Sequence, residues 1–145
     1  MNKKIWILLI ILIILTAFFM VACSSSNRDL EDGTYKAQVD DAYVETEGLG
    51  WREFLELTIQ DGEIIDVTFN AINEKGQYKT DPGVYKMIPN PSIWMPVLEE
   101  NVKNNEGGKI DALTGATSSS TNAQKLLDAI YKDGMVGQTI DVSIK

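Results

Sequence analysis

The sequence predicts an α+β fold, a single small domain in which a mainly antiparallel sheet packs with two to three helices. Two observations lead to this prediction. In the first half of the chain, apolar and polar residues alternate in three segments, which is the period of half-buried strands. In the second half, apolar residues recur every three to four positions, the period of an amphipathic helix, before one last alternating segment.

The first strand is expected at residues 35–40, and the next two should form a hairpin over residues 53–72. The hairpin prediction rests on the Asp61-Gly62 pair, because both central residues of such a turn require positive φ. A closing strand is expected over the alternating residues 140–144. The apolar side chains expected on one face of the hairpin are Leu55, Leu57 and Ile59, then Ile65, Val67, Phe69 and Ala71.

Residues 73–91 are rich in Gly, Pro, Asn and charge, which predicts a long loop with one helical turn around Tyr85. A loop of this length is a candidate for covering a ligand. A helix is predicted over residues 92–103, with Pro96 tolerated in its first turn. A second helix should begin at Thr121, which can form a capping box with Gln124. The apolar positions are Trp94, Val97, Leu98 and Val102 in the first helix, and Ala123, Leu126, Leu127 and Ile130 in the second.

The composition excludes several kinds of chemistry. The 145 residues contain no His and one Cys. Without His there is no Ser-His-Asp or Cys-His catalytic pair and no His-ligated zinc or haem, and one thiol forms neither an internal disulfide nor an iron–sulfur cluster. Redox or catalytic chemistry would therefore use carboxylates, hydroxyls, Lys, Tyr or a cofactor held without His or Cys.

The first 22 residues have the pattern of an export signal. Lys3 and Lys4 precede a run from Ile5 to Ala22 that is apolar except for Thr16. A positive head before an apolar run directs insertion with the head on the cytoplasmic side. Since the run is at the lower limit of what spans a bilayer, an uncleaved anchor is the alternative.

The end of this run resembles the lipobox of bacterial lipoproteins. Met20-Val21-Ala22 precedes Cys23, the cysteine that would be lipidated and become the new N-terminus, although Met stands where Leu is usual. We therefore expect a signal peptide over 1–22, a lipidated Cys23 with a flexible tether over 23–31, and a domain over 32–145. That domain would lie on the extracytoplasmic face of the cell membrane.

The remaining chain is strongly acidic. Without residues 1–22 it has 11 basic and 21 acidic side chains, a net charge of −10. Such a surface matches nucleic acid poorly, so we expect no nucleic-acid partner, and anionic lipid headgroups would repel it. The charge suits either solubility at a membrane surface or steering toward a basic partner.

The segment between the two predicted helices holds the pattern Asp-x-x-[Ser/Thr]-Gly-Ala-[Ser/Thr], at residues 111–117. On its own the segment is a Gly-containing turn with good N-cap residues leading into a helix. With average residue usage, however, the pattern should arise by chance in a chain of this length less than about once in a thousand.

This pattern resembles the flavinylation motif of the FMN-binding domain family, in which a flavin transferase joins the phosphate of FMN to the last Thr or Ser. The resemblance extends to residues 32–37 and 50–54, the hairpin, and the helix with its early Pro96. Among family members, the chain is most similar to small lipoproteins of Gram-positive extracellular electron transfer. The resemblance implies covalent FMN on Thr117, and it places the remaining cofactor-binding or transferase-recognition positions at Asp111, Leu113, Thr114, Gly115, Ala116 and Ser118.

The chemistry of the segment agrees with that assignment. A helix N-terminus stabilises a phosphodiester anion through its free N–H groups and its positive dipole end. Gly115 permits unusual φ and close backbone approach. Four aromatic residues could stack on the flavin ring or be core and loop-anchoring residues instead: Trp51, Trp94, Tyr78 and Tyr85. Residues 40–47 contain four acids, which form either a cation site or a solvated acidic face.

The leading hypothesis is a non-catalytic electron carrier that accepts electrons from a membrane dehydrogenase or the quinone pool and passes them to external acceptors. One alternative is an FMN-dependent reductase or its electron-donating subunit. A third hypothesis is a surface lipoprotein that binds ligands without redox chemistry. No metal site and no catalytic residue is predicted.

Overall fold

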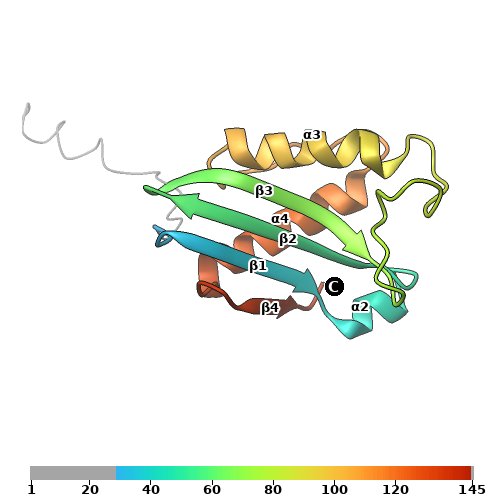
Figure 1. Cartoon of the computed structure of the whole chain (residues 1–145), viewed down its shortest axis with the longest axis horizontal. Helices are drawn as coiled ribbons and strands as arrows, with labels where there is room; N and C mark the ends of the chain where they lie inside the picture. The colour runs from blue at the N-terminus through green and yellow to red at the C-terminus, as the bar shows by residue number, and fades with distance from the viewer. Residues whose placement is uncertain (1–28, 145) are drawn as a thin grey trace, which may run out of the picture.

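The computed structural model describes residues 29–144, so the predicted signal peptide and Cys23 lie outside the described residues. The domain is a four-stranded sheet with two long helices and one short helix (Figure 1). In chain order the elements are β1 (Gly33–Val39), α2 (Asp41–Glu45), β2 (Arg52–Gln60), β3 (Glu63–Ile72), α3 (Pro91–Asn104), α4 (Thr117–Asp133) and β4 (Thr139–Val142).

The strand order in the sheet is β3-β2-β1-β4. The β3–β2 and β2–β1 pairings are antiparallel, whereas β4 lies parallel to β1, which makes the sheet mixed. α3 packs mainly against β3, and α4 packs against the other three strands, so both long helices contribute to one hydrophobic core. The predicted fold class is therefore confirmed, with the parallel β1–β4 pair as an addition.

The hairpin turn forms as predicted, since Asp61 and Gly62 both have positive φ, 54° and 78°. The pairing shifts between Thr58 and Ile59, and this bulge leaves Ile65 as the extra residue of β3. Its side chain is 42% exposed, so the prediction that it faces the core is wrong. The other apolar residues predicted for that face are buried.

Both long helices begin earlier than predicted. α3 begins at Pro91, which puts Pro96 in the second turn, and Val97 is half exposed. α4 begins at Thr117, and the Thr121 hydroxyl donates a hydrogen bond to the carbonyl of Thr117 (3.0 Å), so the predicted capping box is absent. The apolar face predicted for α4 is fully buried.

Two smaller predictions also differ. Residues 73–90 contain turns but no helix, so the helical turn predicted around Tyr85 is wrong. β4 ends at Val142, so Ile144 lies beyond the closing strand.

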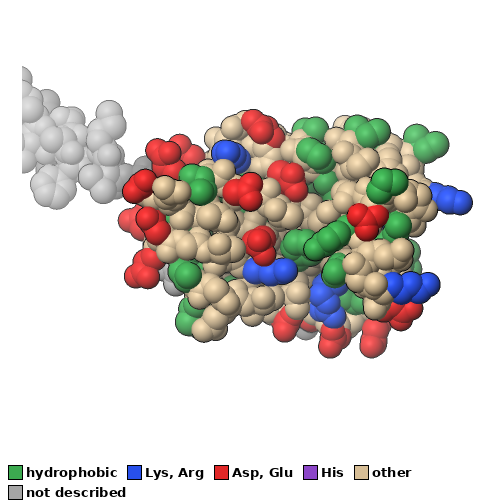
Figure 2. All heavy atoms as spheres, in the orientation of Figure 1, with side chains coloured by type: hydrophobic (Ala, Val, Ile, Leu, Met, Phe, Trp, Pro, Cys, Tyr) green, Lys and Arg blue, Asp and Glu red, His purple; other side chains and the backbone are tan. Residues whose placement is uncertain are grey.

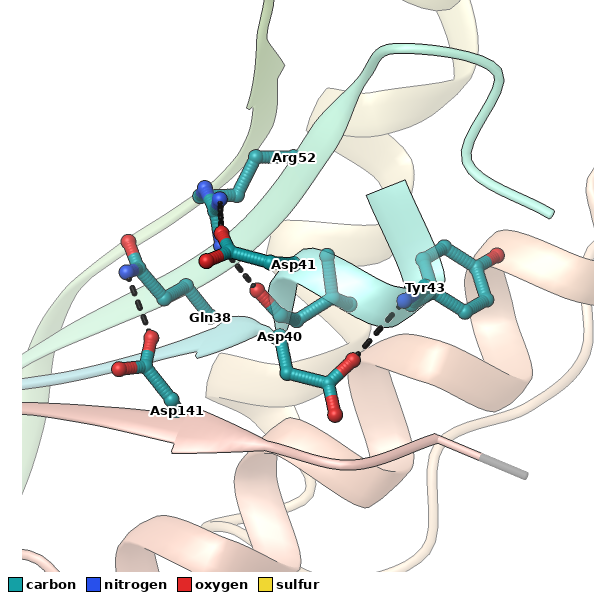
Figure 3. Close-up of polar contacts among 7 residues, drawn as sticks. Gln38, Asp40, Asp41, Tyr43, Arg52 and Asp141 are labelled. Atoms are coloured by element: carbon teal, nitrogen blue, oxygen red, sulfur yellow. Dashed lines mark hydrogen bonds and ion pairs between the residues drawn. The ribbon is translucent and has the colours of Figure 1, made fainter. Parts of the chain in front are cut away.

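The short helix α2 explains two of the acids near residue 40 (Figure 3). The Asp40 carboxylate caps the helix by accepting a hydrogen bond from the N–H of Tyr43 (2.9 Å), and Asp41 forms an ion pair with Arg52. Arg52 also donates to the carbonyl of Val39 (2.6 Å). Within residues 29–144 no cluster of three or more Asp, Glu, His or Cys side chains could hold a metal ion. These acids therefore have structural partners, and α2 holds Tyr43 against the core.

No helix within the described part of the chain has the length and apolarity needed to cross a membrane.

Candidate functional site

A pocket of about 430 Å³ lies where α4 begins. Gly115 and the first residues of α4 line it together with Lys79, Tyr85 and Met87 of the 73–90 loop. The rest of the lining comes from residues 47–49, from Tyr43, Trp51 and Glu53, and from Trp94 of α3. Hollows of about 590 and 680 Å³ elsewhere contain no residue of the motif.

The structure brings four of the seven predicted site residues to this pocket: Gly115, Ala116, Thr117 and Ser118. Ser119, whose hydroxyl the sequence suggested as a further donor to the phosphate, lines it as well. The other three positions lie outside the lining. Asp111 and Thr114 are exposed, and Leu113 packs against the core. Their predicted recognition by a transferase remains a prediction.

The start of α4 has open hydrogen-bond donors. Its N-cap residue, Ala116, offers no side-chain acceptor, and within the described chain no acceptor is found for the N–H groups of the first three helical residues, 117–119. Gly115 has φ +83°, a conformation that strains other residues. The helix therefore presents free donors and its positive dipole end toward the pocket, an arrangement suited to a phosphate.

A buried carboxylate lies beneath this first turn. Glu53 is 4% exposed, and its two oxygens accept hydrogen bonds from Ser119 Oγ and Asn122 Nδ2, both at 2.7 Å. Asn122 Nδ2 also lies 2.6 Å from the hydroxyl of Tyr43, which accepts a hydrogen bond from it. Burial raises the pKa of Tyr43, while this hydrogen bond lowers it. The network fixes the orientation of Ser119 at the pocket.

The sequence prediction did not assign a role to Glu53, although the strand pattern contained the signal. Leu55 and Leu57 point toward the core, and the same alternation extended back by two residues places Glu53 on the inward face. A charged residue at an inward position of a strand is rare unless it is paired.

Another part of the lining is aromatic. The rings of Trp51 and Tyr85 meet edge to face, with centroids 5.5 Å apart and an interplanar angle of 85°. The Lys79 ammonium lies 4.6 Å from the Tyr85 centroid and 5.7 Å from that of Trp51. Tyr78, also predicted as a possible stacking residue, is not among the lining residues and contacts Phe54 instead, with centroids 6.3 Å apart.

Trp94 also lines the pocket and is 7% exposed. Its indole N–H is the one buried side-chain nitrogen or oxygen within residues 29–144 that has no hydrogen-bond partner. Buried donors are nearly always paired in folded proteins, and either an ordered water or an acceptor on a bound ligand would pair this one.

The model of the FMN-binding domain family matches residues 34–132, which run from β1 almost to the end of α4. The chain belongs to this family. A 15 kDa lipoprotein from Treponema pallidum (strain Nichols) is 25% identical over 129 residues, covering 84% of this chain and 87% of that protein. A Clostridium perfringens protein of known crystal structure has a TM-score of 0.69 at 26% identity, covering 80% of this chain and 99% of that one.

FMN as the cofactor suits the pocket of this family member. Its phosphate matches the open donors of α4, its ring matches the aromatic wall, and its carbonyl and hydroxyl oxygens are acceptors of the kind that the Trp94 N–H lacks. The pocket volume falls in the range of small-molecule sites, about 300–1,000 Å³.

Proposed function

We propose that the protein is a lipid-anchored electron carrier outside the cytoplasm, with FMN joined through a phosphoester to Thr117. The observation that carries the proposal is the position of Thr117: its exposed side chain lies in the pocket, at the uncapped start of α4. Thr117 Oγ would form the bond to phosphorus and lose its proton. The leaving group would be the nucleotide half of an activated flavin dinucleotide, supplied by a flavin transferase.

The residues around Thr117 have distinct roles in this proposal. The N–H groups of α4 hold the phosphate oxygens, Trp51 and Tyr85 contact the ring, and the Trp94 N–H donates to an oxygen of the cofactor. Glu53 acts through Ser119, which it holds in place. When bound, FMN supplies reversible uptake of electrons, chemistry that this His-free composition lacks by itself.

The lipid anchor at Cys23 rests on the lipobox pattern and on the lipoprotein name of the T. pallidum relative. Two acyl chains on this cysteine would give stable attachment, because a single chain binds membranes only marginally. A membrane dehydrogenase or the quinone pool would then supply electrons.

Figure 2 shows apolar side chains gathered toward the end of the domain remote from residue 29. Two exposed apolar residues near the pocket are Leu49 (80% exposed) and Ile88 (98% exposed). These side chains provide a contact surface for redox partners.

The covalent bond is tested by coexpressing the chain with a flavin transferase and measuring the intact mass of the purified protein. Thr117→Val keeps the side-chain volume and removes the hydroxyl, so the variant should fold and carry no covalent flavin. Thr121→Val is the matched control, since it removes an exposed hydroxyl one turn further along α4 and should remain fully flavinylated. A yellow chromophore that survives denaturation of Thr117→Val would refute the attachment site.

The carrier role is tested by reducing the flavinylated protein and following its reoxidation by quinones, ferric chelates and organic acids. A carrier should react with chemically unrelated acceptors and show no saturable turnover of one of them. Strong preference for a single organic acid, with the other acceptors inert, would favour a reductase instead.

A further inference from the structure

Of the described residues that line the pocket, Lys79 is the one with a basic side chain, whereas Glu47 and Glu53 are acidic. Any negative charge that appears in the pocket therefore meets a single ammonium group. This residue lies in the 73–90 loop, a segment with no periodic pattern from which the sequence could assign it a role.

The backbone around Lys79 is fixed. Its N–H donates to the carbonyl of Ala71 at the end of β3 (2.8 Å), and the next residue, Thr80, accepts a hydrogen bond from Asn70 Nδ2 (2.8 Å). The ammonium group is positioned over the Tyr85 ring and near the Trp51 ring. These are the two aromatic residues that the proposed function places against the flavin ring. The loop thus holds the positive charge of Lys79 in place beside these two rings.

The ammonium group also has no ion pair. The carboxylate of Glu53 is held by Ser119 and Asn122, and within residues 29–144 Lys79 has no carboxylate oxygen within 4.0 Å. Burial lowers the pKa of Lys79, and the more distant negative charge of Glu53 opposes this change. A half-buried cation that has aromatic contacts but no anionic partner is costly for an empty pocket, and an anion bound beside it would remove part of that cost.

We propose that Lys79 stabilises the negative charge that the flavin ring gains on reduction, and so raises the reduction potential of the bound FMN. The inference rests on the proposed function above. Uptake of two electrons and one proton leaves the ring with one negative charge, and a nearby cation favours that form over the neutral oxidised ring. The electrons come from the membrane donor in the cell and from dithionite in the test below.

The phosphate is the other anion of the cofactor, but the N–H groups at the start of α4 already match it. Lys79 lies instead with Trp51 and Tyr85, whose flat faces suit the ring. The two negative charges of the reduced cofactor thus have separate partners in the pocket.

The test uses the chain flavinylated by coexpression with the transferase. The ratio of reduced to oxidised flavin is measured by absorbance during dithionite titration with an indicator dye of known potential. Lys79→Met should lower this ratio about tenfold at a given dye potential, equal to about 30 mV for a two-electron couple. Lys79→Arg should stay within about twofold of the unmodified chain. Lys86→Met is the matched control, because it removes an exposed positive charge from the same loop and should also change the ratio less than about twofold.

The outcomes separate the inference from the proposed function. A fully flavinylated Lys79→Met protein with an unchanged ratio would overturn the role of Lys79 and leave the carrier intact. Loss of flavin loading in Lys79→Met, with loading retained in Lys86→Met, would assign Lys79 to the phosphate or the transferase and also overturn the inference. If the chain with Lys79 intact carried no covalent flavin, the proposed function would fall and the inference with it. Should Lys79→Met not fold, Lys79→Gln provides the same comparison with a polar head.

Discussion

The two long helices of the domain begin in opposite ways. At α3, the Asn90 side chain accepts a hydrogen bond from the N–H of Ser92 (3.1 Å), and Pro91 has no N–H to satisfy. At α4, Ala116 offers no acceptor even though hydroxyl residues follow it directly. The first helix start is built for stability. The second leaves its donors free, which is what a site for an anion requires.

The start of α4 is held from beneath instead. Ser119 and Asn122 both donate hydrogen bonds to Glu53 of β2, which attaches the first two turns to the sheet without using the backbone N–H groups. α3 has a related contact, in which the Glu99 carboxylate accepts a hydrogen bond from the N–H of Phe69 (2.9 Å). A glutamate thus joins each helix to the sheet. At α4 this contact holds the helix start in place where no capping side chain is present.

The largest expected effect on stability comes from removing this support. Asn122→Ala deletes a buried donor and leaves Glu53 with one partner fewer, so the free energy of unfolding should fall by about 3 kcal/mol. Denaturant unfolding measures the change. Thr121→Ala, the exposed neighbour, should stay within about 0.5 kcal/mol. A loss below about 1 kcal/mol for Asn122→Ala would mean that Glu53 does not hold the start of α4.

A smaller effect is expected at the other helix start. Asn90→Ala removes the cap of α3 and should lower the free energy of unfolding by about 1 kcal/mol, with flavin loading unchanged. Asn104→Ala at the far end of the same helix provides the comparison and should change stability less. Asn90→Asp keeps the capping oxygen and loses only the hydrogen bond from Asn90 Nδ2 to the carbonyl of Tyr85 in the pocket loop. A loss of flavin loading in Asn90→Ala that Asn90→Asp does not share would show that the two helix starts are not functionally separate.

The smallest effect concerns pH. Burial raises the pKa of the Glu99 carboxyl above its usual 4.5, the hydrogen bond from Phe69 opposes the rise, and the charge of Asp66 adds to it. The folded state then binds the proton more tightly than the unfolded chain, so stability should fall as the pH rises from 4.5 through the raised pKa. Glu99→Gln should flatten this decline in denaturant titrations between pH 4 and 8. Asn90→Ala changes no ionisable group and should keep the slope.

The sequence predicted the helices and strands whose apolar residues recur at a regular spacing. Leu55 with Leu57, and Ala123 with Leu126, have the period of their elements, and packing in the structure follows that period. The boundaries were harder, since residues 117–120 are hydroxyl-rich and have the composition of a turn, yet they form the first turn of α4. Ile65 turned outward because a bulge changed the register, which no local pattern encodes.

For the site, the sequence predicted the motif but not its surroundings. Residues 115–118 line the pocket, whereas their binding of a cofactor stays a prediction. Lys79 and Tyr85 reach it through a loop whose path depends on contacts far apart in sequence, such as the one between the rings of Trp51 and Tyr85. Glu53 shows the opposite case, because its inward position could have been deduced from strand alternation alone.

The length of β2 bears on the electron exchange that we propose. The strand runs from Arg52, beside the pocket wall, to Gln60 at the opposite end of the sheet, the end where residue 29 lies (Figure 1). Nine residues of strand span about 30 Å. Covalent geometry lets the six peptide links from Cys23 to Asp29 add at most about 20 Å. With Cys23 held at a membrane, the proposed flavin site would lie at the end of the domain farthest from the anchor. The flavin could then lie at any height from the lipid surface to about 50 Å above it. One bound flavin could therefore contact a donor in the bilayer and an acceptor beyond it in turn.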